Sequence, residues 1–302
     1  MPERPLAPIF AIGTGRSGTT LFFDLLRRHR DLAWPCQFMV GEGKNHRDRW
    51  TERLARVPAV GAPLSRWHRH RRPVPEPYGL WSRYAAGFAR PCRDLEAHDA
   101  PAAAVDQLPE AVALQQRRMR KPRFFSKYTG WSRIGFVDAV FPDARYVHVV
   151  RDGRAVAASL LSVSWWHGWG GPAQWRWGPL PAADQQRWEE SGGSFYVLAG
   201  LQWKLLMHNL TSRGATVGAR YLQVRYEDLV AAPHATLQRV VDWAGLDPDP
   251  DLAPAIDRVA LRDANHKWRE QVPATERAAF ERLLGDELVR FGYAADSATR
   301  AP

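Results

Sequence analysis

Apolar and amphipathic stretches alternate along this chain of 302 residues, and two of the apolar stretches end in a turn that contains glycine. The first apolar run covers residues 8–12, continues into the octet GTGRSGTT at residues 13–20, and is followed by an amphipathic run at residues 21–28. This order predicts a strand, a glycine-rich turn and the start of a helix. A second strand, turn and helix is predicted where the β-rich run of residues 146–150 precedes the helical pattern of residues 155–161.

The rest of the pattern predicts further strands and helices. A long helix is predicted over residues 195–212, and the remaining elements are a strand at residues 221–225 and helices at residues 111–120, 237–244 and 275–291. Alternating strands and helices favour an α/β fold of three layers, in which helices flank a mostly parallel β-sheet. We expect one domain over residues 1–302, with a mostly helical or loop insertion at about 40–120 and a Trp-rich loop at about 162–193.

The octet has the composition of a backbone cradle for an anion. Its glycines let the chain wrap closely around a ligand, and the first helical N–H groups, with the hydroxyls of Thr19 and Thr20, would point towards it. The ATP-binding pattern G-x-x-x-x-G-K-[ST] is not matched, because Thr19 stands where that loop has Lys. The positive charge lies earlier, at Arg16, whose planar guanidinium suits an oxyanion that offers two oxygens at once.

The octet resembles the 5′-phosphosulfate loop of the sulfotransferases that use 3′-phosphoadenosine 5′-phosphosulfate (PAPS), in which the pattern is P-[RK]-[ST]-G-T-T. Gly15 replaces the usual Pro. The second turn resembles the 3′-phosphate motif of the same family, with Arg151 after the strand and Ser159 about two helical turns later. The alternatives are a turn whose glycines serve packing alone and a local ion pair between Arg151 and Asp152.

Three further matches extend the resemblance over most of the chain. By resemblance, Lys127 contacts the transferring sulfonate, and Tyr226, in the segment YEDL at residues 226–229, touches the adenine. Residues 261–268 are similar to a basic segment that closes over the cofactor with a Trp, although its glycines are missing here. The alternatives to these roles are that Lys127 is only a solvated charge and that Tyr226 is an ordinary amphipathic Tyr at a strand end.

The resemblance implies a bacterial-type enzyme with a P-loop-like sulfotransferase fold. Such an enzyme moves the sulfonate of PAPS to an acceptor and releases 3′-phosphoadenosine 5′-phosphate (PAP), with no metal required. Arg16 and Lys127 would neutralise the sulfonate oxygens during transfer. The cofactor-binding residues that the resemblance implies are Gly15, Arg16, Ser17, Gly18, Thr19, Thr20, Arg151, Ser159, Tyr226, Arg262, Lys267 and Trp268.

The general base that would deprotonate the acceptor has several candidates. Cytosolic members of the family carry a His shortly after the Lys, but Tyr128 and Thr129 stand there in this chain. Other members use a Glu about twenty to thirty residues beyond the loop cation, which makes Glu42 the first candidate. Glu76, in an aromatic-rich setting that would bury and tune a carboxylate, is the second candidate, and His167 is the third.

The acceptor is expected at the Trp-rich loop that follows the second motif. Indole rings offer flat apolar faces and N–H donors, which suit a sugar ring or an aromatic molecule. The candidate acceptor-binding residues are Trp165, Trp166, His167 and Trp169. The alternative is a loop pinned to the core by its own Trp residues. We therefore expect sulfonate transfer to a hydroxyl of a glycan-containing or natural-product acceptor.

Composition limits the classes of protein that fit. The formal net charge of +10 suits an anionic cofactor, and the basic segment at residues 66–72 is interpreted as a solvated loop or as a guide for an acidic acceptor. The sequence shows no motif for nucleic-acid or metal binding, and no apolar run long enough for a membrane span. With two cysteines and no signal-peptide pattern, we expect a cytoplasmic enzyme of open oligomeric state.

Two other classes of protein fit parts of the sequence. A P-loop kinase or NTPase shares the strand, the glycine turn and the helix, but the missing Lys argues against it. A non-catalytic protein that binds a nucleotide or a glycan would keep the same fold without the base. Magnesium-dependent turnover of ATP would favour the first class, and cofactor binding without turnover would favour the second.

Overall fold

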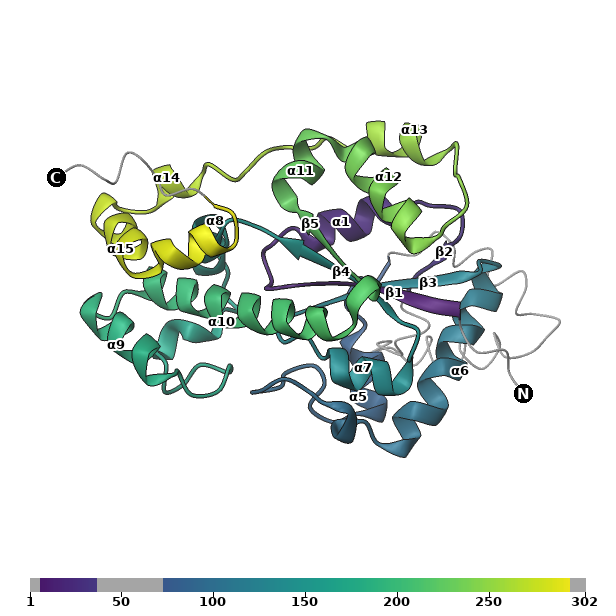
Figure 1. Cartoon of the computed structure of the whole chain (residues 1–302), viewed down its shortest axis with the longest axis horizontal. Helices are drawn as coiled ribbons and strands as arrows, with labels where there is room; N and C mark the ends of the chain where they lie inside the picture. The colour runs from purple at the N-terminus through teal and green to yellow at the C-terminus, as the bar shows by residue number, and fades with distance from the viewer. Residues whose placement is uncertain (1–5, 37–72, 294–302) are drawn as a thin grey trace.

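The computed structural model describes residues 6–36 and 73–293, which form a parallel sheet between layers of helices (Figure 1). The sheet has five strands in the order β2-β3-β1-β4-β5, and every neighbouring pair is parallel. This arrangement confirms the predicted α/β fold. The strands are β1 (Leu6–Gly13), β2 (Leu32–Ala33), β3 (Arg123–Thr129), β4 (Arg145–Val150) and β5 (Tyr221–Arg225).

Two hydrophobic cores fill the space on either side of the sheet. Successive residues of β1 point to opposite faces, so Ile9 and Ala11 pack towards α1 (Thr19–Leu26) and α12 (Pro233–Ala244). Phe10 and Ile12 belong to the core on the other face. That face is covered by α5 (Tyr78–Tyr84), α6 (Ala102–Met119), α7 (Ile134–Val140), α8 (Gly153–Leu161) and α10 (Phe195–Thr216) (Figure 1). Burial on both faces explains why the strands are nearly continuous apolar runs.

Several elements differ from their prediction. No strand was predicted at β3, because the polar pair Ser126 and Lys127 interrupts its apolar run, yet both residues are buried. Helix α6 begins nine residues before the predicted start and contains Pro109. Within the predicted Trp-rich loop lie η2 (His167–Gly170) and α9 (Ala182–Glu190). The remaining elements are η1 (Ala97–Asp99), η3 (Gly218–Arg220), α11 (Tyr226–Ala231), α13 (Leu252–Asp257), α14 (Trp268–Gln271) and α15 (Ala274–Arg290).

The strand order determines where a ligand site can form. Strand β1 lies in the middle; the chain runs from it to β2 and β3 on one side, and then crosses from β3 to β4 on the other side. Such a reversal opens a crevice at the carboxyl ends of parallel strands. The carboxyl ends of β1, β3, β4 and β5 lie at this edge, and the octet and the second turn both begin there. Among the described residues, no helix is long and apolar enough to cross a membrane.

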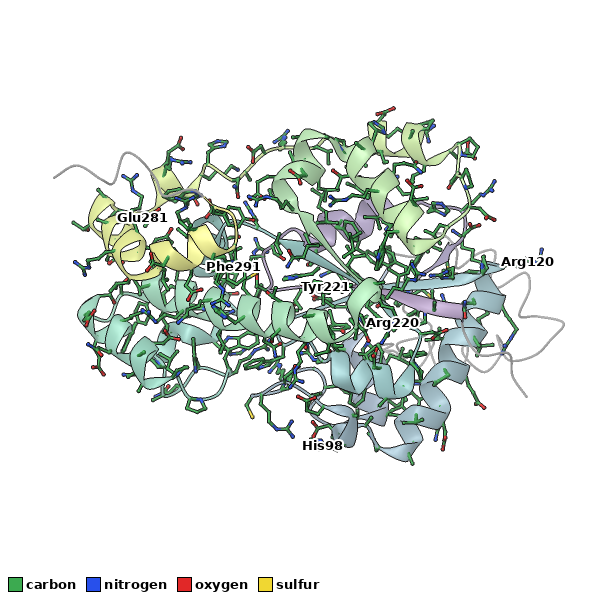
Figure 2. The ribbon with its side chains drawn as sticks, viewed as in Figure 1. His98, Arg120, Arg220, Tyr221, Glu281 and Phe291 are labelled. Carbon is green, nitrogen blue, oxygen red and sulfur yellow. The ribbon has the colours of Figure 1, made fainter. Side chains whose placement is uncertain are left out.

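A buried polar pair joins the sheet to the long helix. His148 of β4 has no exposed surface, and its Nδ1 lies 2.6 Å from the hydroxyl of Tyr221 on β5. Tyr221, labelled in Figure 2, packs its ring against Gly214 of α10. Burial lowers the pKa of His148 to about 3, so the folded protein holds this ring neutral.

His148 predicts a specific loss of stability in acid. Below its ordinary pKa of about 6.5 the unfolded chain takes up a proton that the folded chain refuses, so stability falls with pH between about 6.5 and 3. From about pH 7.5 to about pH 5.5 this residue alone removes roughly 1.4 kcal/mol. Urea unfolding of the wild type and of His148→Gln at both pH values measures the difference. An equal pH dependence in the two proteins would contradict the prediction.

Candidate active site

The octet turns sharply between β1 and α1. Gly15, Arg16 and Gly18 have φ angles of +77°, +56° and +91°, in the left-handed region. Gly18 is the N-cap of α1, and no side chain of the described residues caps the first N–H groups of this helix. Uncapped N–H groups at a helix start, next to a tightly curled loop, form a site that attracts an anion. The loop therefore has the predicted cradle geometry.

Ser17 is the residue of this loop that most directly points to a ligand. Its side chain is almost fully buried, and its Oγ has no hydrogen-bond partner in the described structure. A Cβ atom on Gly13 would lie 2.5 Å from that Oγ, so only glycine leaves room for it. A buried hydroxyl without a partner is costly unless a ligand or water supplies one.

A cavity of about 390 Å³ opens over the loop at the carboxyl edge of the sheet. Strand β3 and the segments that follow β1, β4 and β5 contribute residues to its wall, in agreement with the crevice expected from the strand order. The lining residues are Gly15, Arg16, Gly18, Thr19, Thr20, Leu21, Glu76, Lys127, Thr129, Arg151, Trp165 and Tyr226. Three of them are cations: Arg16, Lys127 and Arg151.

Arg16 and Arg151 each contact the segment that carries the other. Arg16 donates through Nε to the hydroxyl of Ser159, at 2.9 Å, and its own carbonyl accepts a hydrogen bond from Arg151 at 3.1 Å. The guanidinium of Arg151 lies over the ring of Tyr226, with Cζ 4.3 Å from the ring centre. The structure thus brings together four of the predicted cofactor-binding residues, Arg16, Arg151, Ser159 and Tyr226, from three separate motifs of the sequence.

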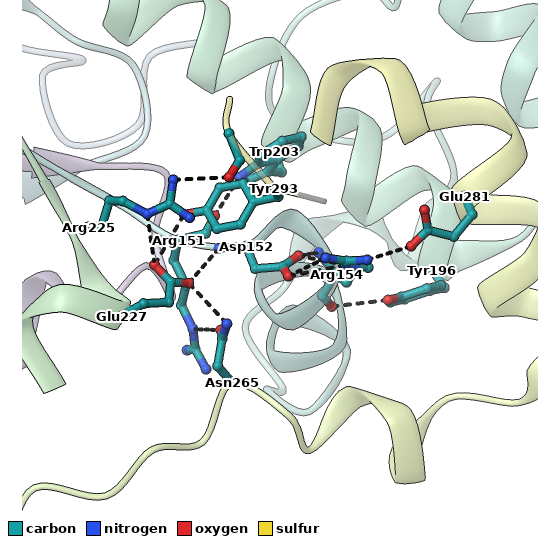
Figure 3. A network of polar contacts seen from close by, with 11 residues as sticks. Arg151, Asp152, Arg154, Tyr196, Trp203, Arg225, Glu227, Asn265, Glu281 and Tyr293 are labelled. Atoms are coloured by element: carbon teal, nitrogen blue, oxygen red, sulfur yellow. Dashed lines mark hydrogen bonds and ion pairs between the residues drawn. The ribbon is translucent and has the colours of Figure 1, made fainter. Parts of the chain in front are cut away.

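Two residues to which the sequence analysis assigned no role hold Arg151 in place (Figure 3). Asn265 accepts a hydrogen bond from Arg151 Nε at 3.1 Å and donates one to Glu227 Oε1 at 3.0 Å. Glu227 Oε1 also accepts from the backbone N–H of Asp152, next to Arg151. Burial raises the pKa of Glu227. Glu227 lies in the segment YEDL and Asn265 in residues 261–268. Their position inside these two matched segments is the sequence signal that could have pointed to them.

The local ion pair considered for Arg151 and Asp152 is wrong. The carboxylate of Asp152 accepts from the Nε and Nη2 of Arg154, with the shortest bond at 2.7 Å (Figure 3). Arg154 also donates to Glu281 of α15 at 2.7 Å. The carboxylate of Asp152 therefore pairs with Arg154 and not with Arg151. The guanidinium of Arg151 faces the cavity, and its side-chain hydrogen-bond partner is the neutral amide of Asn265.

Glu76 lies next to Lys127 on the opposite wall of the cavity. Lys127 Nζ forms an ion pair with Glu76 Oε1 at 2.8 Å, and the hydroxyl of Thr129 donates to the same oxygen at 3.0 Å. The segment that carries Glu76 runs along β3, where the Pro75 carbonyl accepts the backbone N–H of Lys127. The Lys127 side chain is 4% exposed and that of Glu76 is 31% exposed, so the carboxylate is the more accessible partner.

The candidate acceptor residues separate into two groups. Trp165 lines the cavity and is 56% exposed. Trp166 lies outside the cavity wall, because it is buried and donates through Nε1 to Gln202 of α10. Trp169 packs its ring edge-on against Trp166, and His167 is exposed. The pinned-loop interpretation therefore holds for Trp166, and the cavity takes only Trp165 from this set.

The C-terminal segment does not close over the cavity as its resemblance implied. Trp268 is buried between the guanidinium groups of Arg154 and Arg269, away from the cavity wall. Arg262 and Lys267 are exposed, and Arg262 contributes its carbonyl, which accepts from the Tyr226 hydroxyl at 3.4 Å. Glu42 and the basic segment at residues 66–72 lie outside the described residues. The described residues contain no group of His, Cys, Asp and Glu placed to bind a metal ion.

Residues 8–251 match the sulfotransferase family, so the chain belongs to that family and is an enzyme of sulfonate transfer. The chain is 28% identical to the nodulation protein NoeE of Sinorhizobium fredii, over 96% of this chain and 68% of that protein. It is 27% identical to the omega-hydroxy-beta-dihydromenaquinone-9 sulfotransferase Stf3 of Mycobacterium bovis, over 58% of this chain and 42% of that protein.

Solved structures show the same fold. The sulfotransferase STF9 of Mycobacterium avium matches with a TM-score of 0.57 at 16% identity, over 96% of this chain and 78% of that one. The sulfotransferase domain of the curacin biosynthetic pathway matches with a TM-score of 0.54 at 14% identity, over 97% of this chain and 100% of that one. The family and the fold inferred from the octet are therefore confirmed.

Gly18 packs against the ring of Tyr226, so we predict that a side chain at position 18 lowers the free energy of unfolding. A Cβ on Gly18 would lie 2.3 Å from the Tyr226 ring, whereas a Cβ on Gly15 would meet nothing within 4 Å. Both residues have positive φ, so alanine costs about 1 kcal/mol at either position. Gly18→Ala must also displace the ring, for a total loss of about 2 kcal/mol or more. Urea unfolding of both variants tests this, and equal losses would refute the clash.

Proposed function

We propose that this enzyme transfers the sulfonate of PAPS to a hydroxyl of a small organic or glycan acceptor. The observation that carries the proposal is the convergence of Arg16, Lys127 and Arg151 on one cavity, where Glu76, paired with Lys127, is the single carboxylate among the described lining residues. A cavity with this excess of positive charge suits a ligand with several anionic groups. PAPS carries such groups at both ends of its ribose.

The residues present fit PAPS in a definite orientation. Arg151, with Ser159 close by on α8, would hold the 3′-phosphate. The uncapped start of α1 and the unpartnered Ser17 hydroxyl would hold the 5′-phosphosulfate, in place of the hydrogen bonds that they lack. Tyr226, on the same wall, would contact the adenine. PAPS itself supplies the activated sulfonate, so no metal ligand is needed for this assignment.

The chemistry requires positioning and charge neutralisation. Sulfonate transfer resembles phosphoryl transfer, in which the nucleophile attacks in line with the leaving group and protein cations neutralise the charge that spreads over the oxygens. Lys127 is buried and fixed by its ion pair, so its ammonium needs little reorganisation to meet a sulfonate oxygen. Arg16 lies across the cavity and would neutralise the oxygen that leaves with the 5′-phosphate.

Glu76 is the base that the described structure favours. Its Oε1 accepts from Lys127 and Thr129, which fixes the carboxylate, while its Oε2 has no hydrogen bond with any described residue. Oε2 would take the proton of the acceptor hydroxyl as the oxygen attacks sulfur. Thr129 and Lys127 then act as positioning groups for the base. Glu42 stays a prediction, and His167 lies off the cavity wall.

Two alternatives lose support. The sulfotransferase family match and the absence of a Lys after Gly18 argue against a P-loop kinase or NTPase. A non-catalytic binding protein would have no need for a half-exposed carboxylate fixed beside a buried Lys at the cavity. The arrangement of Glu76 and Lys127 therefore favours catalysis.

Arg151→Ala tests the cofactor assignment. Calorimetric titration with PAP, in buffer without magnesium, is expected to show binding to the wild type that weakens about tenfold or more in the variant. That loss corresponds to about 1.4 kcal/mol, the value of a charge-assisted contact. Arg187→Ala, which removes a surface arginine paired with Asp184, should leave PAP affinity unchanged. Binding indifferent to Arg151, or matched by ATP with magnesium, would refute the assignment.

Glu76→Gln tests the base. Transfer from PAPS to a panel of phenol and sugar acceptors should fall by a factor of about 10² to 10⁴, because the amide cannot take the proton. PAP affinity should stay within about twofold, since Glu76 contacts Lys127 rather than the proposed 3′-phosphate side. Glu110→Gln, at an exposed position of α6, is the matched control. Unchanged transfer in Glu76→Gln would exclude this residue as the base.

A further inference from the structure

A cluster of arginines lies at the end of β3, next to Thr129, which lines the cavity. A Cβ on Gly130, the residue after Thr129, would lie 2.9 Å from the ring of Trp177, so this ring covers the end of β3. The guanidinium of Arg176 stacks on that ring, with Cζ 4.5 Å from the ring centre. The chain beyond Trp177 packs against the carbonyl of Cys92, which brings the segment of residues 88–92 to the same place.

Arg133 and Arg90 complete the cluster. Arg133 has no exposed surface, and it donates to three backbone carbonyls, those of Phe88, Thr129 and Trp131. Arg90 lies two residues from Phe88 and is exposed. The three arginines thus come from three segments that meet behind Thr129, which itself lines the cavity.

The cluster has no counter-ion in the described part of the chain. Neither Arg176, Arg133 nor Arg90 forms an ion pair with any described carboxylate. The Nε of Arg176 and the Nη2 of Arg133 are buried without a hydrogen-bond partner. Buried positive charge and unpaired N–H groups are both costly, so a site of this kind is expected to receive an anion.

The charge of Glu76 acts on the cluster. Burial lowers the pKa of Arg176, and the positive charges of Arg133 and Arg90 lower that pKa further. Tyr78 and Glu76 act in the opposite direction and raise it. Arg176 is thus close enough to the proposed base to feel its charge. Burial, Arg176 and Arg90 also lower the pKa of His167. Cations for the cofactor, Arg16 and Arg151, lie instead at the octet and at the end of β4.

We propose that Arg176, with Arg90 at the rim and Arg133 beneath, binds an acidic group of the acceptor, a carboxylate or a phosphate monoester. This inference rests on the proposed function, because it places the acceptor hydroxyl at Glu76 and the acid of the same molecule at Arg176. A planar guanidinium stacked on an indole presents a rigid fork to two anionic oxygens. The subsite would select acidic hydroxyl compounds over neutral ones of the same shape.

The test uses matched acceptors and the complex of the enzyme with PAP. Calorimetry measures the affinity of that complex for 4-hydroxyphenylacetate and its amide, and for glucose 6-phosphate and glucose. We expect at least one acid to bind about tenfold or more tightly than its neutral partner. Arg176→Gln should abolish the preference and Arg176→Lys should keep part of it, because Lys retains the charge but not the fork. Arg187→Gln on α9 is the control.

PAP affinity, measured in each variant, separates the possible failures. A wild type that does not bind PAP would refute the proposed function, whereas normal PAP binding without any acid preference would refute this inference alone. An acid preference that survives Arg176→Gln would also overturn it. Inorganic phosphate is the last probe, because an Arg176-dependent affinity equal to that of the acids would assign the subsite to a free anion and not to the acceptor. If Arg176→Gln loses PAP binding through misfolding, the acid preference of Arg176→Lys is compared with that of the wild type, and an undiminished preference would overturn the inference.

Discussion

The site depends on one geometric constraint, the common direction of the strands. Because β1, β3, β4 and β5 are parallel, their carboxyl ends lie at one edge, and the register sets Gly13 beside Thr129 and Ile12 beside His148. Segments that are far apart in the sequence therefore meet over the octet. Both faces of the sheet are buried, so a shift of one strand by one residue would exchange the side chains that pack into the two cores as well as disperse the site.

Positive charge is the second constraint, and the fold controls how each cation is paired. Lys127 is neutralised by Glu76, and Arg154 by Asp152 and Glu281, so these two cations are fixed within the protein. Arg151 has instead a neutral amide partner in Asn265, which orients the guanidinium without cancelling its charge. The ion pairs stiffen the protein around Lys127 and Arg154, whereas no described carboxylate cancels the charge of Arg151 through an ion pair.

The sequence predicted the elements whose patterns are strong and missed those whose patterns are broken. Helix α10 and strand β5 were found from their periodicity, whereas β3 was missed because Ser126 and Lys127 interrupt its apolar run. The cofactor loops were found because their residues are consecutive. Asn265 was not assigned a role, since its contact with Arg151 joins residues 114 positions apart, and Trp166 was placed at the acceptor although its indole N–H is satisfied inside the core.

The sequence by itself determined the family, the α/β fold and the loop that would receive the phosphosulfate, because short-range patterns of glycine, apolar and basic residues are enough to encode them. Only the tertiary structure decided which carboxylate stands beside Lys127, which Trp faces the cavity, and that Arg176, Arg133 and Arg90 meet without a counter-ion among the described residues. Those facts depend on contacts between distant segments. A linear pattern records which charges a chain carries, but pairing and burial are settled only when the segments pack together.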